Sequence, residues 1–314
     1  MTAHIFIDGS AGTTGLQIQE RLAARGDISL ILLDAAEKKD PVRRGQALND
    51  ADVSILCLPD AAAKETVSLA RANSVRIIDT STAHRTDPDW VYGLAELKAG
   101  QADLISGAAR VSNPGCYPTG VIVALNPLVA AGMVPADYPV AVSAVSGYTG
   151  GGKQMIAEYE NTDGGAGDDS PPAAFHLYGL QLQHKHLAEM QVYGGLAKPP
   201  VFIPSVGNFP QGMITQVPLD LARLPGTPTV AHIHDTLAAF YAGSEVIELV
   251  SLSDAQTVKR LPGDMMAGSD KLKLYVFGDE AKQQVMIAAV FDNLGKGASG
   301  AAVQNLDLML GARV

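Results

Sequence analysis

The chain has little cysteine, no long apolar run and no cluster of basic residues, and each of these absences excludes a class of protein. Only two cysteines, Cys57 and Cys116, occur in 314 residues, which excludes a disulfide framework and indicates a reducing compartment. No apolar stretch is long enough to span a membrane. Lys and Arg total 23 against 33 Asp and Glu, and no basic run exceeds two residues. We therefore expect neither a nucleic-acid nor a membrane partner.

The remaining composition is that of a globular enzyme. Hydrophobic residues make up 47% of the chain and charged residues 18%. Its length exceeds that of one ordinary hydrophobic core, so two domains are expected. The sequence opens directly on an apolar strand pattern at residues 4–7, from which we expect no leader peptide and a cytoplasmic location.

Residues 1–115 alternate the patterns of strands and helices. Four apolar runs predict strands: 4–7, 29–33, 53–58 and 75–78. Helical patterns at 16–24 and 61–73 connect them. Short crossovers of this kind build a parallel, doubly wound α/β sheet, so this part is predicted to be a Rossmann-type domain.

From residue 116 to 297 the pattern is that of an α+β domain with a mostly antiparallel sheet. Six apolar runs predict its strands: 140–145, 201–203, 213–218, 246–252, 272–277 and 284–291. Residues 229–242 predict a helix, and the stretch 161–172, rich in Gly, Asp and Pro, predicts a mobile loop. A last helical pattern lies in residues 298–314, which are expected to complete the first domain.

A glycine-rich turn joins the first predicted strand to the first predicted helix. Gly9, Gly12 and Gly15 stand where a phosphate-cradling loop is found in dinucleotide-binding domains. Glycines let the backbone approach a pyrophosphate, which faces the helix N-terminus. The residues expected to bind a dinucleotide here are Gly9, Ser10, Gly12, Thr13, Thr14 and Gly15. The alternative is a tight strand-to-helix turn without a ligand.

The residues after the second strand leave the choice of nicotinamide cofactor open. Asp34 ends that strand and could bind a ribose 2′-hydroxyl, which favours NAD. Lys38, Lys39, Arg43 and Arg44 follow closely and could pair with the 2′-phosphate of NADP. For each of these four cations, a solvated charged segment is the competing interpretation.

Cys116 has the surroundings of a nucleophile. It follows a Pro-Gly turn and precedes the apolar run 121–125, with Pro118 in the first turn of the predicted helix. The unpaired N–H groups and dipole of a helix N-terminus favour the thiolate that attacks carbonyls. Cys57, in contrast, lies within the apolar run 53–58 and is expected to be a core residue. Arg110, six residues before Cys116, could hold an anion.

A thiol that accepts an acyl group needs an acid–base partner, and two histidines are candidates. His186 and Glu189 are three residues apart, so they share a helix face and the carboxylate could fix the imidazole tautomer. His84, beside Arg85 in a predicted strand-end loop, is the rival. His184 and His186 lie only two apart and lack further ligands, so no metal site is expected.

Three motifs together resemble the N-acetyl-gamma-glutamyl-phosphate reductase family, in its shorter subtype, within the aspartate-semialdehyde dehydrogenase-like superfamily. They are Asn-Pro-Gly-Cys-Tyr-Pro-Thr-Gly at 113–120, the His-x-x-Glu pair at 186–189, and Lys-Gly-Ala-Ser-Gly-Ala-Ala-Val-Gln-Asn at 296–305. The resemblance extends over essentially the whole chain. It implies an NADPH-dependent reduction of an acyl phosphate to an aldehyde in arginine biosynthesis, with Cys116 forming a thioester and His186 as acid and base.

The resemblance also implies further site residues and an oligomer. Substrate or phosphate contacts are expected of Arg110, Asn113, Arg85 and Glu189. The cofactor, NADP(H), is expected to lie against Ser81, Gly300 and Asn305, besides the glycine loop. Enzymes with such folds are usually homodimers or homotetramers.

Two other functions remain compatible with the sequence. Reductases of aspartyl or amino-adipyl phosphate share the chemistry and differ in the acyl group. A non-catalytic NADP-binding redox sensor would use Cys116 as its switch, although Cys57 offers no plausible resolving thiol. Phosphate-dependent oxidation of an aldehyde would separate the enzymes from the sensor.

Overall fold

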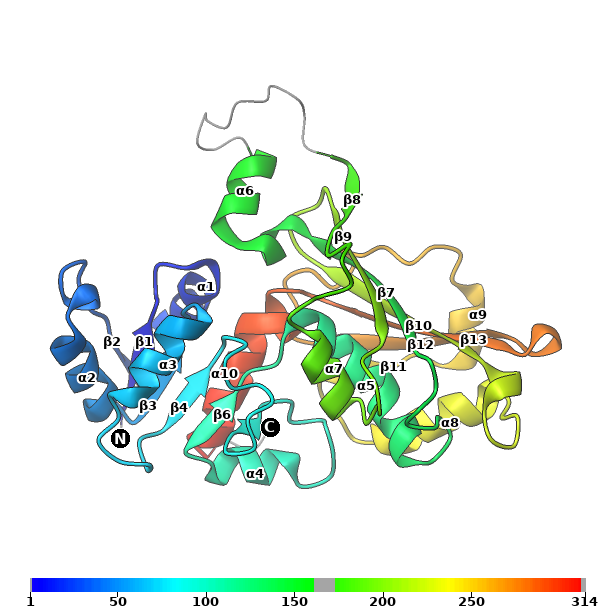
Figure 1. Cartoon of the computed structure of the whole chain (residues 1–314), viewed down its shortest axis with the longest axis horizontal. Helices are drawn as coiled ribbons and strands as arrows, with labels where there is room; N and C mark the ends of the chain where they lie inside the picture. The colour runs from blue at the N-terminus through cyan, green and yellow to red at the C-terminus, as the bar shows by residue number, and fades with distance from the viewer. Residues whose placement is uncertain (1, 161–172, 312–314) are drawn as a thin grey trace. The chain divides into compact units, whose positions relative to one another are not determined.

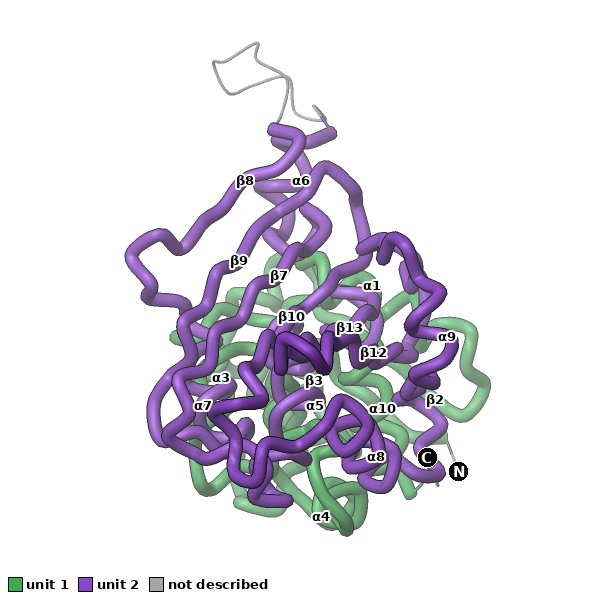
Figure 2. Tube along the Cα trace, turned by 90° about the vertical axis from the view of Figure 1, so that its right-hand side faces the viewer, with its two compact units in different colours: residues 1–115, 298–314 green, residues 116–297 purple. Residues whose placement is uncertain are grey.

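The computed structural model describes residues 2–160 and 173–311, which form two compact units (Figure 2). The first unit consists of residues 1–115 and 298–314, and the second of residues 116–297. The loop expected at 161–172 lies outside the described residues. The chain therefore leaves the first unit once and returns to it near its C-terminus.

The first unit is built on a parallel sheet of six strands. They are β1 (Ala3–Asp8), β2 (Ile28–Ile31), β3 (Val53–Leu56), β4 (Ile77–Asp79), β5 (Val91–Tyr92) and β6 (Arg110–Ser112). Their order is β2-β1-β3-β4-β6-β5, and every pairing is parallel. The chain moves outward in opposite directions from β1, so the carboxyl ends of β1 and β3 form a topological switch point, where such sheets bind ligands.

Helices cover both faces of this sheet (Figure 1). On one face lie α1 (Thr13–Ala23), α4 (Gln101–Gly107) and α10 (Gly300–Met309), and on the other α2 (Pro41–Asp50) and α3 (Asp60–Ser68). Successive residues of β1 alternate between the two cores, with Ile5 and Ile7 in the first and Phe6 in the second. The predicted doubly wound fold is thus confirmed.

The second unit is built on a mixed sheet of seven strands. They are β7 (Ala141–Gly147), β8 (Phe175–Leu177), β9 (Val201–Gly207), β10 (Met213–Asp220), β11 (Ile247–Leu249), β12 (Leu272–Asp279) and β13 (Gln284–Phe291). Their order is β11-β12-β13-β10-β7-β9-β8. Its helices are α5 (Cys116–Ala130), α6 (Gly152–Glu160), α7 (Leu187–Tyr193), α8 (Val230–Phe240) and α9 (Leu252–Thr257). Its 3₁₀ turns are η2 (Tyr148–Gly151), η3 (Leu221–Arg223) and η4 (Glu280–Lys282). The first unit contains the 3₁₀ turn η1 (Glu37–Lys39), and the π-helical segment η5 (Gly295–Ser299) spans the boundary at which the chain returns to the first unit.

The second sheet is mostly antiparallel, as predicted, but two of its pairings are parallel. β9 pairs with β7 in parallel, and β11 pairs with β12 in parallel, so the antiparallel pairing expected of runs 201–203 and 246–252 is wrong. The chain between β7 and β9 carries α6 and α7, and the chain between β11 and β12 carries α9. Long connections allow parallel crossovers, whereas the apolar pattern of a strand does not reveal the direction of its neighbour.

Helix α5 is the most deeply buried helix segment of the second unit. Eleven of its 15 residues are buried, which matches its apolar sequence and its place between the sheet and α7 and α8. Gly120 permits the close approach, because a Cβ there would lie 2.4 Å from Thr215 Oγ1 and 2.7 Å from Phe291. The N-terminal half of α5 therefore packs closely against β10 and β13.

Among the described residues, no helix is both long enough and apolar enough to cross a membrane.

A buried ion pair ties the second face of the first unit to the end of β1. Arg44 on α2 donates to Asp8 Oδ2 at 3.0 Å, and the side chains of both residues are at least nine-tenths buried. Thr66 on α3 donates to the same oxygen at 3.1 Å and also contacts the Arg44 guanidinium. Three elements therefore meet at one carboxylate, directly before the glycine loop.

Replacing Arg44 by Met is expected to destabilise the protein by about 3–5 kcal/mol, because the buried Asp8 carboxylate would lose its counter-charge. Arg43→Met is the matched control, since Arg43 pairs with Glu37 at the surface. The midpoint of urea unfolding measures both. Equal midpoints for the two variants would contradict the structural role assigned to Arg44.

Candidate functional site

The three glycines of the loop after β1 differ in what they are needed for. Gly9 has φ +85°, and a Cβ there would lie 2.2 Å from the Cys57 carbonyl oxygen. A Cβ on Gly15 would lie 2.4 Å from the carbonyl oxygen of Gly9. Both glycines are therefore required by the packing of the loop itself.

Gly12 is different, because the protein leaves room for a side chain there. A Cβ on Gly12 would meet nothing nearer than 3.5 Å, an ordinary van der Waals distance. Gly12 is the N-cap residue of α1, and Thr13 and Thr14 form the first turn of that helix. Its open side fits the approach of a pyrophosphate to the helix N-terminus, which a Cβ would obstruct.

The charged segment after β2 divides into structural and accessible cations. Arg44 is buried and pairs with Asp8, so of the four cations that could bind a 2′-phosphate it has a structural role within the first unit. Arg43 pairs with Glu37 at 2.7 Å. Asp34 Oδ1 accepts the N–H groups of Ala36 and Glu37, both at 2.8 Å, and these bonds lower the pKa of Asp34. Asp34 thus shapes the turn that leads into η1, which carries Lys38 and Lys39.

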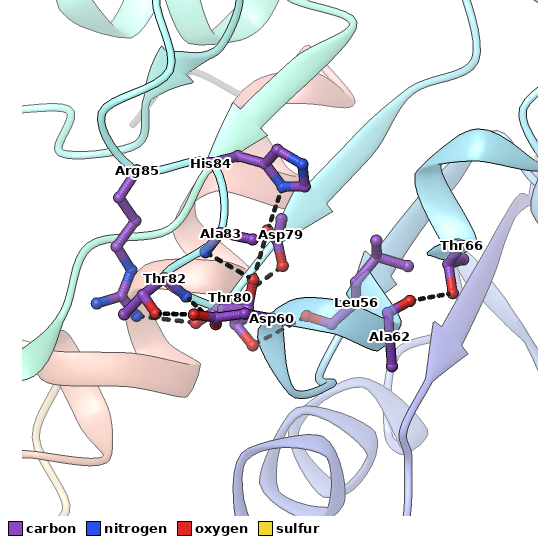
Figure 3. A network of polar contacts seen from close by, with 11 residues as sticks. Leu56, Asp60, Ala62, Thr66, Asp79, Thr80, Thr82, Ala83, His84 and Arg85 are labelled. Atoms are coloured by element: carbon purple, nitrogen blue, oxygen red, sulfur yellow. Dashed lines mark hydrogen bonds and ion pairs between the residues drawn. The ribbon is translucent and has the colours of Figure 1, made fainter. Parts of the chain in front are cut away.

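A buried polar network follows the carboxyl end of β4 (Figure 3). Asp79 is fully buried, and its Oδ2 accepts from the Ser81 hydroxyl at 2.7 Å and lies 2.6 Å from His84 Nδ1. The His84 ring stacks on Trp90 with centroids 4.2 Å apart. Asp79 and Trp90 therefore hold the His84 ring from two sides within the first unit. Ser81 donates its hydroxyl to the same Asp79 carboxylate.

Arg85 and Arg110 both donate to main-chain carbonyls in the first unit. Arg85 is buried and donates to the Thr80 carbonyl at 2.8 Å. Arg110 opens β6, and its guanidinium contacts the Val75 carbonyl and lies over the Trp90 ring, 6.0 Å from its centroid. Val75 precedes β4, so these contacts hold Arg110 at the amino end of the sheet, and the expected contact with substrate phosphate is not supported.

Asn113 and Asn305 bind each other rather than facing solvent. Asn305 Nδ2 donates to Asn113 Oδ1 and to the Gly93 carbonyl, each at 3.0 Å, while Asn113 Nδ2 donates to the Ala298 carbonyl at 3.1 Å. Asn113 is 1% exposed and Asn305 is fully buried. The two amides thus fasten α10, which begins at Gly300, to the loop that leads out of the first unit. This placement explains their presence structurally and supports no direct contact with substrate or cofactor.

Cys116 is the first residue of α5, as the Pro-Gly-Cys sequence predicted. The chain returns close to it at Gly297, where a Cβ would lie 3.0 Å from the Cys116 Cβ. Gly297 N–H donates to the Asp292 carbonyl at 2.9 Å, which holds this approach in place. Neither cysteine forms a disulfide. Burial raises the pKa of the Cys57 thiol to about 12, so that thiol stays protonated in the core.

The histidine-rich turn before α7 packs against the residue next to Cys116. His186 is 6% exposed and precedes α7, and Glu189, in the first turn of that helix, is 1% exposed. The Tyr117 ring lies 6.1 Å from the His186 ring and 6.0 Å from the His184 ring. His186 and Cys116 therefore belong to one unit, whereas His84 belongs to the other.

Three residues that surround the His186 turn were not predicted from the sequence as site residues: Tyr117, Tyr178 and His184. His184 carried a signal, since it lies within the His-Lys-His run, but it was considered there only as a metal ligand. Tyr178 directly follows β8, and only the folded structure brings its ring against that of His184. Within residues 2–160 and 173–311, no group of three His, Cys, Asp or Glu residues is placed to hold a metal ion.

Two family models match the chain in turn. Residues 5–105 match the semialdehyde dehydrogenase, NAD binding domain, and residues 116–293 match the semialdehyde dehydrogenase, dimerisation domain. The first match lies within the first unit and the second match lies within the second unit.

Curated relatives cover the whole length. N-acetyl-gamma-glutamyl-phosphate reductases of Brucella ovis and Brucella canis are each 54% identical over 312 residues, covering 99% of this chain and 100% of theirs.

Solved structures share the fold at low sequence identity. Aspartate semialdehyde dehydrogenase II of Vibrio cholerae, complexed with ASA, is 16% identical with a TM-score of 0.71, covering 99% of this chain and 98% of its own. The aspartate semialdehyde dehydrogenase of Candida albicans with NADP is 13% identical with a TM-score of 0.65, covering 99% of both chains. The full-length identity to the Brucella proteins decides the assignment: the chain belongs to the N-acetyl-gamma-glutamyl-phosphate reductase family of semialdehyde dehydrogenases.

Proposed function

We propose that this protein reduces N-acetyl-gamma-glutamyl phosphate to N-acetyl-glutamate semialdehyde and phosphate, using NADPH, as a step of arginine biosynthesis. The observation that carries the proposal is the position of Cys116 at the start of α5, with the turn bearing His186 packed against the neighbouring Tyr117. The names of the relatives supply the acyl group.

The first step transfers the acyl group to the enzyme. The positive end of α5 favours the thiolate of Cys116, which attacks the acyl carbon. Main-chain N–H groups at the N-terminus of α5 stabilise the oxyanion that forms. The bond to phosphate then breaks, phosphate leaves with the electron pair and takes up one proton from water, and a thioester with Cys116 remains.

The second step needs a proton at the carbonyl oxygen. NADPH, when bound, supplies the hydride that reduces the thioester carbon. His186 donates a proton to the resulting oxyanion and gives a thiohemiacetal on Cys116. Removal of the hydroxyl proton by His186 then releases the aldehyde and restores the thiolate, so the net reaction consumes one acyl phosphate, one NADPH and one proton.

The first unit supports the choice of cofactor. The glycine loop lies at the switch point of a parallel sheet, and Gly12 leaves an open approach to the N-terminus of α1. Lys38 and Lys39 follow the Asp34 turn, where a 2′-phosphate needs cations, and this favours NADP(H).

We propose further that the protein is a homodimer or homotetramer of the cytoplasm. Apolar side chains of the edge strand β8 and its neighbour β9 stand exposed on one face of the second sheet: Phe175, Leu177, Val201 and Ile203. This surface lies in the part that matches a dimerisation domain, and a second copy would cover it. Two reduced cysteines suit a reducing compartment.

The reaction run in reverse tests the substrate assignment. N-acetyl-glutamate semialdehyde, NADP and phosphate should yield reduced cofactor, and omission of phosphate should stop its formation. Faster turnover of aspartate semialdehyde or amino-adipate semialdehyde would assign that acyl group to the substrate instead. Silence with all three aldehydes would refute the enzymatic proposal and favour a sensor.

Cys116→Ser is expected to abolish turnover while leaving NADP(H) affinity close to that of the wild type, because the hydroxyl cannot replace the thiolate. Cys57→Ala is the matched control and should remain active, since Cys57 is a core thiol. Steady-state rates and cofactor titration measure both. Wild-type turnover by Cys116→Ser would refute the thioester mechanism.

His186→Asn is expected to lower kcat by roughly a hundredfold or more, because the proton transfers lose their donor and acceptor. The measurement is the pH–rate profile of the variant beside the wild type. If the profile and kcat stay unchanged, the acid–base role passes to another group, with His84→Asn as the next variant to examine.

Gly12→Ala is expected to weaken NADP(H) binding by about tenfold or more without changing the unfolding midpoint, because the added methyl meets the cofactor and not the protein. Gly26→Ala is the control, since a Cβ on Gly26 has no neighbour within 4 Å. Calorimetric titration gives both affinities. An unchanged affinity in Gly12→Ala would place the pyrophosphate elsewhere.

A further inference from the structure

The turn that carries His186 is closed by another histidine. The main-chain N–H of His186 donates to His184 Nδ1 at 3.1 Å, and the N–H of Leu187 donates to the His184 carbonyl at 3.0 Å. His184 thus accepts from two successive residues, one through its ring and one through its backbone. The His184 and His186 rings also meet edge to face, with centroids 4.7 Å apart.

These bonds define the state of the His184 ring. Because Nδ1 accepts an N–H, the proton of the neutral ring must reside on Nε2, which lies 3.5 Å from the Tyr178 hydroxyl. Burial, assisted by the charge of Lys185, lowers the pKa of His184 to about 4. The ring is therefore neutral near pH 7, with one acceptor and one donor, and both are engaged.

The same contacts lead to the helix that begins at Cys116. The Tyr178 and Tyr117 rings lie 6.5 Å apart between their centroids, and the Tyr117 hydroxyl donates to the Ser205 carbonyl on β9 at 3.0 Å. Burial raises the pKa of both tyrosines, so both remain protonated. Phe202, also on β9, packs against the Tyr117 and His184 rings at 5.1 and 5.2 Å. The chain of contacts runs from the His186 turn through His184 and Tyr178 to Tyr117, the residue beside Cys116.

We propose that His184 is a positioning residue, which holds His186 in the orientation needed for proton transfer and ties its turn, through Tyr178 and Tyr117, to the start of α5. This inference rests on the proposed function, in which His186 is the acid and base. His184 is unsuited to that role itself, because its Nδ1 is occupied by a main-chain N–H and its ring does not take up a proton near neutral pH.

Three substitutions separate positioning from packing. In His184→Asn, the side-chain oxygen can take the place of Nδ1 and accept from the His186 N–H. His184→Gln offers an amide near the place of Nε2, toward Tyr178, and lacks the Nδ1 acceptor. His184→Leu fills the space without either polar group.

Positioning and packing predict opposite orders of activity. If His184 positions His186, His184→Leu and His184→Gln lower kcat by roughly ten- to a hundredfold with little change in the KM for the acyl phosphate, and His184→Asn recovers most of it. If His184 only fills space, the bulky Leu variant retains more activity than the Asn variant. Loss of kcat in Asn equal to that in Leu, or full activity in all three, would overturn the proposal.

A second measurement does not depend on turnover. The nitrogen chemical shifts of the His186 ring should change in His184→Leu and return toward the wild-type values in His184→Asn. If the wild type reduces no acyl phosphate, the proposed function fails while this comparison still tests the link between the two histidines. Unchanged shifts in His184→Leu would refute the link even in an active enzyme.

The lowered pKa of His184 makes the free energy of unfolding depend on pH, and the wild type and His184→Asn should differ in this dependence. The folded-state pKa of His184 lies below the ordinary value of 6.5, so the unfolded chain binds the proton first as the pH falls. The stabilisation due to the neutral ring is complete above about pH 6.5 and is lost progressively between 6.5 and 4. The other titratable groups that face the ring, Tyr117 on α5, Tyr178 after β8, Lys185 and His186, remain in His184→Asn. That variant should therefore lose less stability across this interval than the wild type, and an equal loss would contradict a neutral His184.

Discussion

The close packing of α5 on the second sheet is the constraint on which the site depends. Gly120 allows the helix to approach Thr215 and Phe291 on neighbouring strands, and the burial of eleven of its 15 residues restricts its movement. The helix begins at Cys116, so this packing fixes the direction in which the thiol and the first N–H groups point. A reactive thiol on a mobile loop would lack that definition.

The histidine turn is fixed by contacts with the same helix. Tyr117 extends from the first turn of α5 to Ser205, Phe202 and the rings of His184 and His186. The proposed nucleophile and the proposed acid–base residue are 70 positions apart in the chain, and both contact the same scaffold of aromatic and polar groups. In the first unit, the buried Asp8–Arg44 pair holds the start of the loop after β1, and the Asp79–Ser81–His84 network holds the loop after β4.

The sequence predicted the fold class and the start of α5 because these depend on local patterns. Alternating strands and helices, a Pro-Gly turn and a following apolar run are sufficient for that. The direction of β9 and β11 was not predictable, since parallel and antiparallel strands have the same apolar pattern. The structural partners of Arg44 and Arg110 were not predictable for another reason: Asp8 and Val75 lie 36 and 35 positions away in the chain. His184 was visible in the sequence, but its bond to the next turn exists only in the fold.

The most direct test of the account is the capture of the acyl-enzyme. N-acetyl-gamma-glutamyl phosphate, generated in place and mixed with the protein in the absence of NADPH, should release one phosphate per active subunit in a burst. Mass spectrometry should then find the N-acetyl-glutamyl group on the peptide containing Cys116, removable by hydroxylamine or by addition of NADPH. Phosphate release without any adduct at Cys116, or an adduct at Cys57, would contradict an account in which the start of α5 makes Cys116 the nucleophile.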